Sequence, residues 1–343
     1  MCTLFRYPDG AWPNLLAIAY AFFGWGIGVW LLTRPEWALN GLGVILTAHT
    51  LVYSAYLIHE CAHNTIFASP KINDRLGEAL SWLNGACVAT YRGLKEKHLR
   101  HHADRLDVVT FDYRAVLNAA PQWVRRLVLA LEWAYVPAVE ILLRGLVIAT
   151  PFQYGTLQDR IRTGAIVLVR AAFFVGLALI SIKAVLLYAV AYLLFVNVMR
   201  FMDAFQHTYD VFATRSLDKA PDELVRDRKY EYENTYSNLV SLRMPWLNLL
   251  VMNFPYHNAH HTRPALPWYQ LPELHRSLYG NGDRPVMSQV MPCRTLLASY
   301  HKHRVARVFA TDYGTVAPEG DRAAGYIGGH SPRKNFLNII AST

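Results

Sequence analysis

Four stretches of this chain are apolar and long enough to cross a lipid bilayer, and they restrict the possible folds more than any other feature. They cover about residues 12–33, 37–58, 164–182 and 184–205. Short turns at 34–36 and 181–183 join the members of each pair, so the two helices of a pair must be antiparallel neighbours. Because only helices and closed barrels satisfy their backbone in lipid, we predict an all-α integral membrane protein with four transmembrane helices in two hairpins.

The distribution of charge predicts how these hairpins are oriented. Hydrophobic residues make up 53% of the 343 residues and charged residues only 17%, below the quarter usual in soluble domains. Most Lys and Arg residues lie between the hairpins or after the second one, and the positive-inside rule places those segments in the cytoplasm together with both termini. We expect a multi-pass protein of the bacterial inner membrane, or of the endoplasmic reticulum in a eukaryote. The net charge of +9 accompanies no nucleic-acid-binding motif, so the expected partner is the lipid bilayer rather than nucleic acid.

The segments outside the hairpins are expected to form interfacial helices and a cytoplasmic helical cap. Residues 124–150 are apolar but carry charges that would be costly inside the bilayer, so we predict a pair of interfacial helices broken near Pro137. Residues 78–91 are too short to cross and are expected at the surface. We expect one domain over residues 1–315 and a loosely ordered tail at 316–343, which is rich in Gly, Ser, Pro and charge.

Histidine carries the chemical signal of the sequence. The segments HECAH at 59–63, HLRHH at 98–102 and HNAHH at 257–261 are joined by a single histidine at 207. Histidines three and four residues apart lie on one face of a helix, so each group is expected to point its rings at one place. Neutral imidazole suits iron, zinc, copper and nickel, and nine rings exceed what one ion accepts, so we predict two metal ions. The candidate ligands are His59, His63, His98, His101, His102, His207, His257, His260 and His261.

Two other classes of protein fit part of this pattern. An intramembrane zinc metalloprotease would use His59 and His63 as ligands and Glu60 as general base in an HExxH motif, but it needs one further ligand and leaves six of the nine histidines without a role. A metal transporter or a non-catalytic metal binder would hold its ligands near the bilayer midplane rather than at one face.

The three histidine groups, in this order around two membrane hairpins, resemble the histidine boxes of the membrane-bound fatty acid desaturase superfamily, which also contains alkane hydroxylases, sterol-type oxidases and carotenoid oxygenases. The resemblance covers about residues 37–280. It implies a di-iron centre at the cytoplasmic ends of the helices, with O2 as co-substrate, that removes hydrogen from an unactivated carbon. The nine histidines become its ligands, His207 among them. Stearoyl-CoA desaturases have Asn four residues before the histidine that corresponds to His207. This chain has Asp203 there, which would bind iron or support a ligand.

A centre held by neutral ligands stays positively charged, so nearby acids should orient the rings and stabilise the charge. The candidates are Glu60, Asp104, Asp107, Asp112, Asp203 and Asp210. We interpret His49, inside the second apolar stretch, as structural, with service at the site as the alternative. The histidines outside the boxes are expected at the surface: His275, His301, His303 and His330. Arg170 and Arg200 are expected to extend toward the headgroups, with a role near the iron or the substrate head as the alternative.

The second box favours one reaction within the superfamily. Its HxxHH spacing resembles acyl desaturases, whereas alkane hydroxylases resemble HxxxHH, so we predict an O2-dependent desaturase that introduces a C=C bond into a fatty acyl chain. A fatty acid or alkane hydroxylase and a 1-alkene-forming fatty acid decarboxylase remain the alternatives. The chain has neither an HPGG haem motif nor a Rossmann glycine pattern, so electrons are expected from an external ferredoxin, rubredoxin or cytochrome b5 with its reductase.

Overall fold

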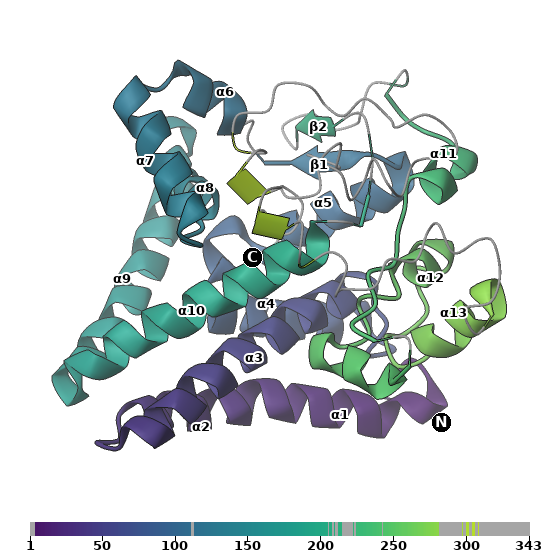
Figure 1. Ribbon diagram of the computed structural model, residues 1–343, viewed down its shortest axis with the longest axis horizontal. Helices are drawn as coiled ribbons and strands as arrows, with labels where there is room; N and C mark the ends of the chain where they lie inside the picture. The colour runs from purple at the N-terminus through teal and green to yellow at the C-terminus, as the bar shows by residue number, and fades with distance from the viewer. Residues whose placement is uncertain are drawn as a thin grey trace.

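The computed structural model describes residues 4–110, 113–204, 206–207, 209, 212–214, 222, 224–241, 243–280, 297, 300–301, 304–305 and 308. Over these residues the chain is mostly helical, which confirms the predicted fold class. Figure 1 shows the turns of two long hairpins at lower left and the helices of the cap at the opposite end. The predictions for Asp112, Asp210, His303, His330 and the tail at 316–343 lie outside the described residues.

The first hairpin joins two membrane-spanning helices. A short 3-10 helix, η1 (Pro8–Gly10), leads into α1 (Ala11–Ala19), the π-helical turn η2 (Tyr20–Gly24) and α2 (Trp25–Leu32), which together form one span. The returning helix α3 (Trp37–Ala62) packs closely on α2, since a Cβ at Gly28 would lie 2.5 Å from Thr47 Oγ1. α3 runs four residues further than the apolar stretch that predicted it, so the first histidine box lies on its last turn.

The second hairpin consists of α9 (Leu157–Ile180) and α10 (Ile182–Asp203). α9 begins seven residues earlier than the predicted span because Thr156 and Asp159 form a capping box at its start. The Ser181 hydroxyl accepts a hydrogen bond from the Ala184 amide and so caps α10 immediately after the turn. α10 packs along α3, which brings the C-terminal ends of these two helices together (Figure 1). All four predicted spans are therefore present as helices in a membrane protein.

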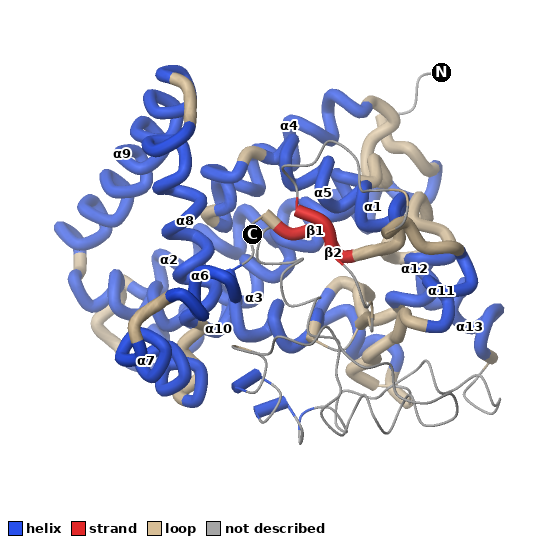
Figure 2. The backbone as a smooth tube through the Cα atoms, turned by 90° about the horizontal axis from the view of Figure 1, so that it is seen from above, coloured by secondary structure: helices blue, strands red, loops and turns tan. Residues whose placement is uncertain are grey.

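The cap is built from short elements that follow each hairpin. After the first hairpin come α4 (Pro70–Asn84), η3 (Ala86–Ala89), α5 (Tyr91–Asp104), β1 (Asp107–Val109), α6 (Tyr113–Ala119), α7 (Gln122–Trp133) and α8 (Ala138–Tyr154). After the second come β2 (Phe212–Thr214), α11 (Arg228–Glu233), η4 (Pro245–Val251), α12 (His257–Thr262) and α13 (Leu271–Tyr279). β1 and β2 pair in parallel, with Val108 opposite Ala213, a small ladder that the sequence did not predict (Figure 2). It ties the end of α5 to the chain that follows α10.

Helices α7 and α8 confirm the predicted pair and its break at Pro137, but two of their charges are not at the surface. Glu132 and Glu140 are buried against Arg200 of α10, whose side chain is 1% exposed. Arg200 Nη1 lies 2.9 Å from Glu132 Oε2, and Arg200 Nε lies 2.6 Å from Glu140 Oε1. Arg304 adds a second cation, 2.8 Å from Glu132 Oε2. The expectation that Arg200 extends to the headgroups is therefore wrong, because two carboxylates balance its charge in place.

Glu132 is the group in this cluster that pairs with both arginines, so its removal should be costly. Replacing it with Leu leaves Arg200 and Arg304 buried with one carboxylate fewer, and removing one partner of a buried ion pair typically costs about 3–5 kcal/mol. The variant Glu132→Leu should therefore melt well below the parent in detergent. The control is Glu96→Leu on α5, since its partner Arg92 is 89% exposed and the melting temperature should hardly change. Equal melting of both variants would contradict a stabilising cluster.

Candidate metal centre

Nine histidine side chains from separate parts of the chain converge where the cap meets the ends of α3 and α10. His59 lies on the last turn of α3 and His63 caps its end. The second and third boxes lie on α5 and α12, and His207 follows α10 in an isolated bridge with Thr235. Eight of the nine rings are connected by the Nε2 contacts described below, and His261 lies 4.3 Å from His102 between ring centroids. The structure thus brings together every histidine that the sequence analysis selected.

Five of these rings form the first group, which consists of His59, His63, His98, His102 and His260. Their ligand nitrogens all lie within 4.8 Å of one another. Adjacent Nε2 atoms are 2.7 Å apart between His63 and His98, 3.2 Å between His98 and His102, and 3.1 Å between His102 and His260. His59 closes the group with its Nε2 3.1 Å from that of His260.

The other four rings form the second group. His101, His207 and His261 each place a nitrogen within 4.8 Å of the others. The Nε2 atom of His257 lies 2.8 Å from that of His207, so this ring joins the same group. His101 Nε2 is 3.2 Å from His207 Nε2. Both groups therefore use Nε2 atoms that face one another rather than solvent.

The second and third boxes each divide their rings between the two groups. On α5, His98 and His102 serve the first group and His101 the second, and on α12, His257 and His261 serve the second and His260 the first. The expectation that each box points at one place is therefore wrong for these two boxes, whereas His59 and His63 of the first box both serve the first group. On a helix, positions i and i+4 are about 40° apart, whereas positions i+3 and i+4 diverge by about 100°. The HxxHH spacing consequently supplies ligands to two neighbouring ions from one helix.

The donor set fits a metal cation. Burial, followed by repulsion from neighbouring histidines, lowers the pKa of His98, His102 and His260 well below the ordinary value, so these rings are neutral, which is the form that binds metal. Each neutral ring has one N–H, and five Nε2 atoms that face one another cannot all be satisfied by mutual hydrogen bonds. A cation among the nitrogens satisfies all of them at once.

The outer nitrogens of the second group support this assignment. His101 Nδ1 lies 2.9 Å from the carbonyl oxygen of Leu106, to which it donates, and His207 Nδ1 lies 3.2 Å from Thr235 Oγ1. The Thr235 hydroxyl itself donates to the Glu231 carbonyl, so its oxygen accepts from the ring. With the proton on Nδ1, the lone pair of Nε2 points into the group.

The acids predicted to support the ligands differ in what they contact. Glu60 is buried, with Oε1 3.3 Å from His59 Nδ1, while its Oε2 accepts from the Thr65 hydroxyl at 2.6 Å and from the Trp268 amide at 3.1 Å. Asp107 Oδ1 lies 3.7 Å from His101 Nδ1. Glu60 is therefore placed to orient the His59 ring, whereas the His101 ring near Asp107 donates its Nδ1 proton to the Leu106 carbonyl.

The other two described candidates are placed differently. Asp104 lies 3.4 Å from Arg100 Nε, as expected for an ion pair within α5. Asp203 is 4% exposed and lines the cavity described below, and whether it binds metal stays a prediction.

Glu231 was missed by the sequence analysis. Its Oε1 lies 2.9 Å from His261 Nδ1, and its Oε2 lies 3.4 Å from both Arg105 and Arg228. Nothing in the spacing of the sequence relates Glu231 to a histidine box thirty residues later. Only the folding of the chain brings the two side chains together.

The other histidines that the structure describes, His49, His275 and His301, lie apart from both groups. His49 is structural, since Tyr20 donates to its Nδ1 and its Nε2 lies 2.8 Å from the Leu250 carbonyl. The prediction that His275 is a surface group is wrong, because its ring packs between Tyr256 and Tyr279 at centroid distances of 5.0 and 4.9 Å. His301 is half-buried against Trp133 and Tyr135.

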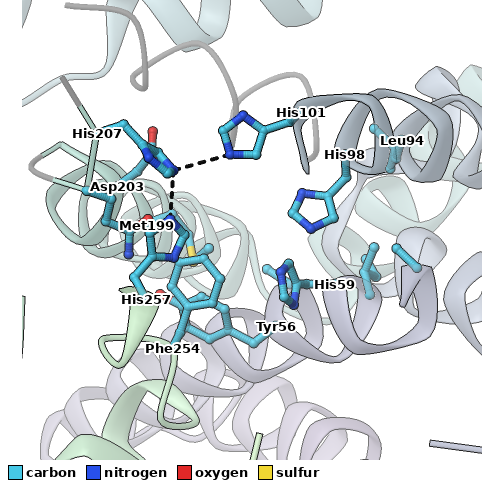
Figure 3. Close-up of a pocket in the computed structure, with 14 residues that line it drawn as sticks. Tyr56, His59, Leu94, His98, His101, Met199, Asp203, His207, Phe254 and His257 are labelled. Carbon is cyan, nitrogen blue, oxygen red and sulfur yellow. Dashed lines mark hydrogen bonds between the residues drawn. The ribbon is translucent and has the colours of Figure 1, made fainter. Parts of the chain in front are cut away.

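A cavity with mostly apolar walls opens beside both groups. His59 and His98 of the first group and His101, His207 and His257 of the second line it (Figure 3). Its other walls are largely hydrocarbon, contributed by Ala55, Tyr56, Ile58, Ala62, Leu94, Met199 and Phe254, together with Asp203 and Gln206. A non-polar chain in this cavity would lie directly against the metal-binding nitrogens.

A comparison with protein families identifies the family of the chain. Residues 35–289, most of the chain, match the family model described as fatty acid desaturase. The chain belongs to the fatty acid desaturase family. No curated protein matches it at a significant level. Family membership indicates an oxidoreductase of the desaturase and hydroxylase kind, and it implies iron as the metal of the histidine groups.

Glu231 offers a test of the second group in this desaturase-family protein. Loss of a carboxylate that orients a ligand histidine typically lowers metal affinity by about 10- to 100-fold. The variant Glu231→Ala should therefore lose metal to a chelator at a lower concentration than the parent, as measured by mass spectrometry of bound metal. Glu233→Ala on the same helix is the control, since Glu233 lies 4.0 Å from Lys229, whose side chain is exposed. Parent-like retention in Glu231→Ala would exclude this role.

Proposed function

We propose that the protein is an O2-dependent di-iron desaturase that introduces a C=C bond into a fatty acyl chain. The observation that carries the proposal is the position of the apolar cavity, which is lined by histidines of both groups. A hydrocarbon chain is the substrate that such walls accept without an energetic penalty, because they offer few polar partners. Family membership supplies the chemical class, and the cavity supplies the reason for an acyl substrate.

In this proposal each histidine group holds one iron ion. Bound iron would supply the activation of O2 and the removal of hydrogen from an unactivated carbon. The apolar walls of the cavity would hold the substrate and exclude water. Glu60, Thr235 and Glu231 would fix the tautomers of His59, His207 and His261, respectively. Asp203, at the cavity wall beside His207, is proposed as a further ligand or as an acceptor that supports one.

The contacts of Glu60 disfavour the zinc metalloprotease. A general base must reach a water molecule on the metal, and that metal would be on the Nε2 side of His59. Both carboxylate oxygens of Glu60 instead face the Nδ1 side of the ring, Thr65 and the Trp268 amide. The HExxH pattern is therefore better explained as two ligands with a supporting carboxylate between them.

Expression together with a matching reductase tests the reaction. Mass spectrometry of lipids, free acids and volatile hydrocarbons should show new unsaturated acyl chains. Hydroxy acids or 1-alkenes would replace the desaturase assignment by a hydroxylase or a decarboxylase and leave the di-iron centre intact.

His207 is the most isolated ligand in sequence and therefore the sharpest single substitution. His207→Ala should abolish product and lower the iron content, since its Nε2 contacts both His101 and His257. His301→Ala is the control and should keep both, since the His301 ring packs on Trp133 and Tyr135. Full product formation by His207→Ala would exclude this ligand.

We also propose that both termini and the metal site are cytoplasmic and that an external ferredoxin, rubredoxin or cytochrome b5 system delivers the electrons. The excess of Lys and Arg outside the hairpin turns supports this orientation. A green fluorescent protein fused after residue 343 should fluoresce in a bacterial host, and alkaline phosphatase at the same place should be inactive. Active phosphatase at that position would reverse the orientation.

A further inference from the structure

The 3-10 helix η4, which leads toward the third histidine box, lies against the side of the first hairpin. η4 packs on α3, and its last carbonyl groups are hydrogen-bonded to α3 side chains. The Tyr53 hydroxyl donates to the Leu249 carbonyl, and His49 Nε2 lies 2.8 Å from the Leu250 carbonyl. Tyr53 and His49 lie well inside the span that α3 forms and not at its end.

The positions of Tyr53 and His49 along α3 indicate how deep η4 reaches. The apolar stretch of this helix ends at Ile58, five residues after Tyr53 and nine after His49. At a rise of about 1.5 Å per residue, the two side chains lie about 7 and 13 Å below Ile58 along the helix. η4 therefore contacts α3 within its apolar, membrane-spanning part.

The outward face of η4 is apolar. Met244, Trp246, Leu249 and Leu250 are between 41% and 63% exposed. An exposed patch of this kind is unusual in water. Its nearest counterparts are the lipid-facing side chains of α3, such as Ile45 at 65%. Ile45 lies one helical turn before His49, whose ring contacts Leu250, so the exposed face of η4 continues the lipid-facing surface of α3 and lipid acyl chains would cover it.

Side chains satisfy several backbone groups around the segment, as a location in lipid requires. Asn248 is completely buried, and its Oδ1 accepts from the Val240 amide at 2.8 Å. Its Nδ2 lies 3.1 Å from the Ser241 carbonyl and 3.0 Å from the Pro245 carbonyl. One amide side chain thus joins the descending chain to the helix.

The membrane side of the segment is satisfied by a second set of groups. Tyr20 donates to His49 Nδ1, which leaves the proton of the neutral ring on Nε2, where it is donated to Leu250. Tyr53 provides the donor for the preceding carbonyl. We refer to Tyr20, His49 and Tyr53 as the latch.

We propose that residues 243–251 form a re-entrant segment that enters the lipid bilayer and returns, held by the latch. Arg243 is exposed where the segment begins and can reach the headgroups. The chain turns back at Met252 and Asn253, both with positive φ, and His257 follows four residues later. The third histidine box is thereby anchored to a membrane-embedded element.

Labelling in phospholipid vesicles tests whether the segment is in lipid. An NBD fluorophore on Leu250→Cys should emit as in hydrocarbon, be quenched by doxyl-labelled phospholipid and be protected from aqueous iodide. Ile45→Cys on the lipid face of α3 and Ser277→Cys on the exposed face of α13 are the hydrocarbon and water controls. Trp246→Cys is the second position, in case Leu250→Cys does not fold. Emission and quenching like those of the Ser277→Cys control would overturn the proposal.

The latch is tested on the same fluorophore. Tyr53→Phe and His49→Phe each remove a donor to a carbonyl of η4, so iodide quenching at position 250 should rise several-fold. Tyr188→Phe is the matched control, since this hydroxyl accepts from Trp25 at 3.4 Å elsewhere between the spans, and quenching should stay at the parent value. Unchanged quenching in both latch variants would contradict their role.

Discussion

The convergence of nine imidazoles is the constraint on which the rest of the structure depends. The Nε2 atoms of eight of them meet at 2.7–3.2 Å, and without a cation this arrangement would leave lone pairs facing one another. The two hairpins exist in this form because α3 and α10 must end side by side (Figure 1). The cap then only has to bring α5 and α12 over those ends, and each of these short helices contributes to both groups.

The sequence predicted much of this arrangement because its signals are strong and local. Apolar length identified the spans, HxxHH spacing placed the boxes on helices, and Pro137 marked the break between α7 and α8. Three features were not predictable because they depend on packing between distant segments. The first is the division of two boxes between the groups, and the second is the carboxylate of Glu231 beside His261. The third is the burial of Arg200 between Glu132 and Glu140. A single charged residue looks the same in sequence whether it meets water or a partner.

The membrane and the metal centre are joined by more than the hairpins. The Trp268 amide donates to Glu60, and its indole donates to Asn14 of α1, so the chain after the third box is tied both to the first box and to the first span. The segment before that box is hydrogen-bonded to α3. The histidines of α12 are consequently held from both sides by elements fixed in lipid, which preorganises ligands that are far apart in sequence.

The most direct measurement of the central claim is anomalous diffraction from metal-loaded crystals, recorded on both sides of the iron absorption edge. The account predicts two iron peaks, one enclosed by His59, His63, His98, His102 and His260 and the other by His101, His207, His257 and His261. A single peak, or a signal that appears at the zinc edge and not at the iron edge, would contradict it.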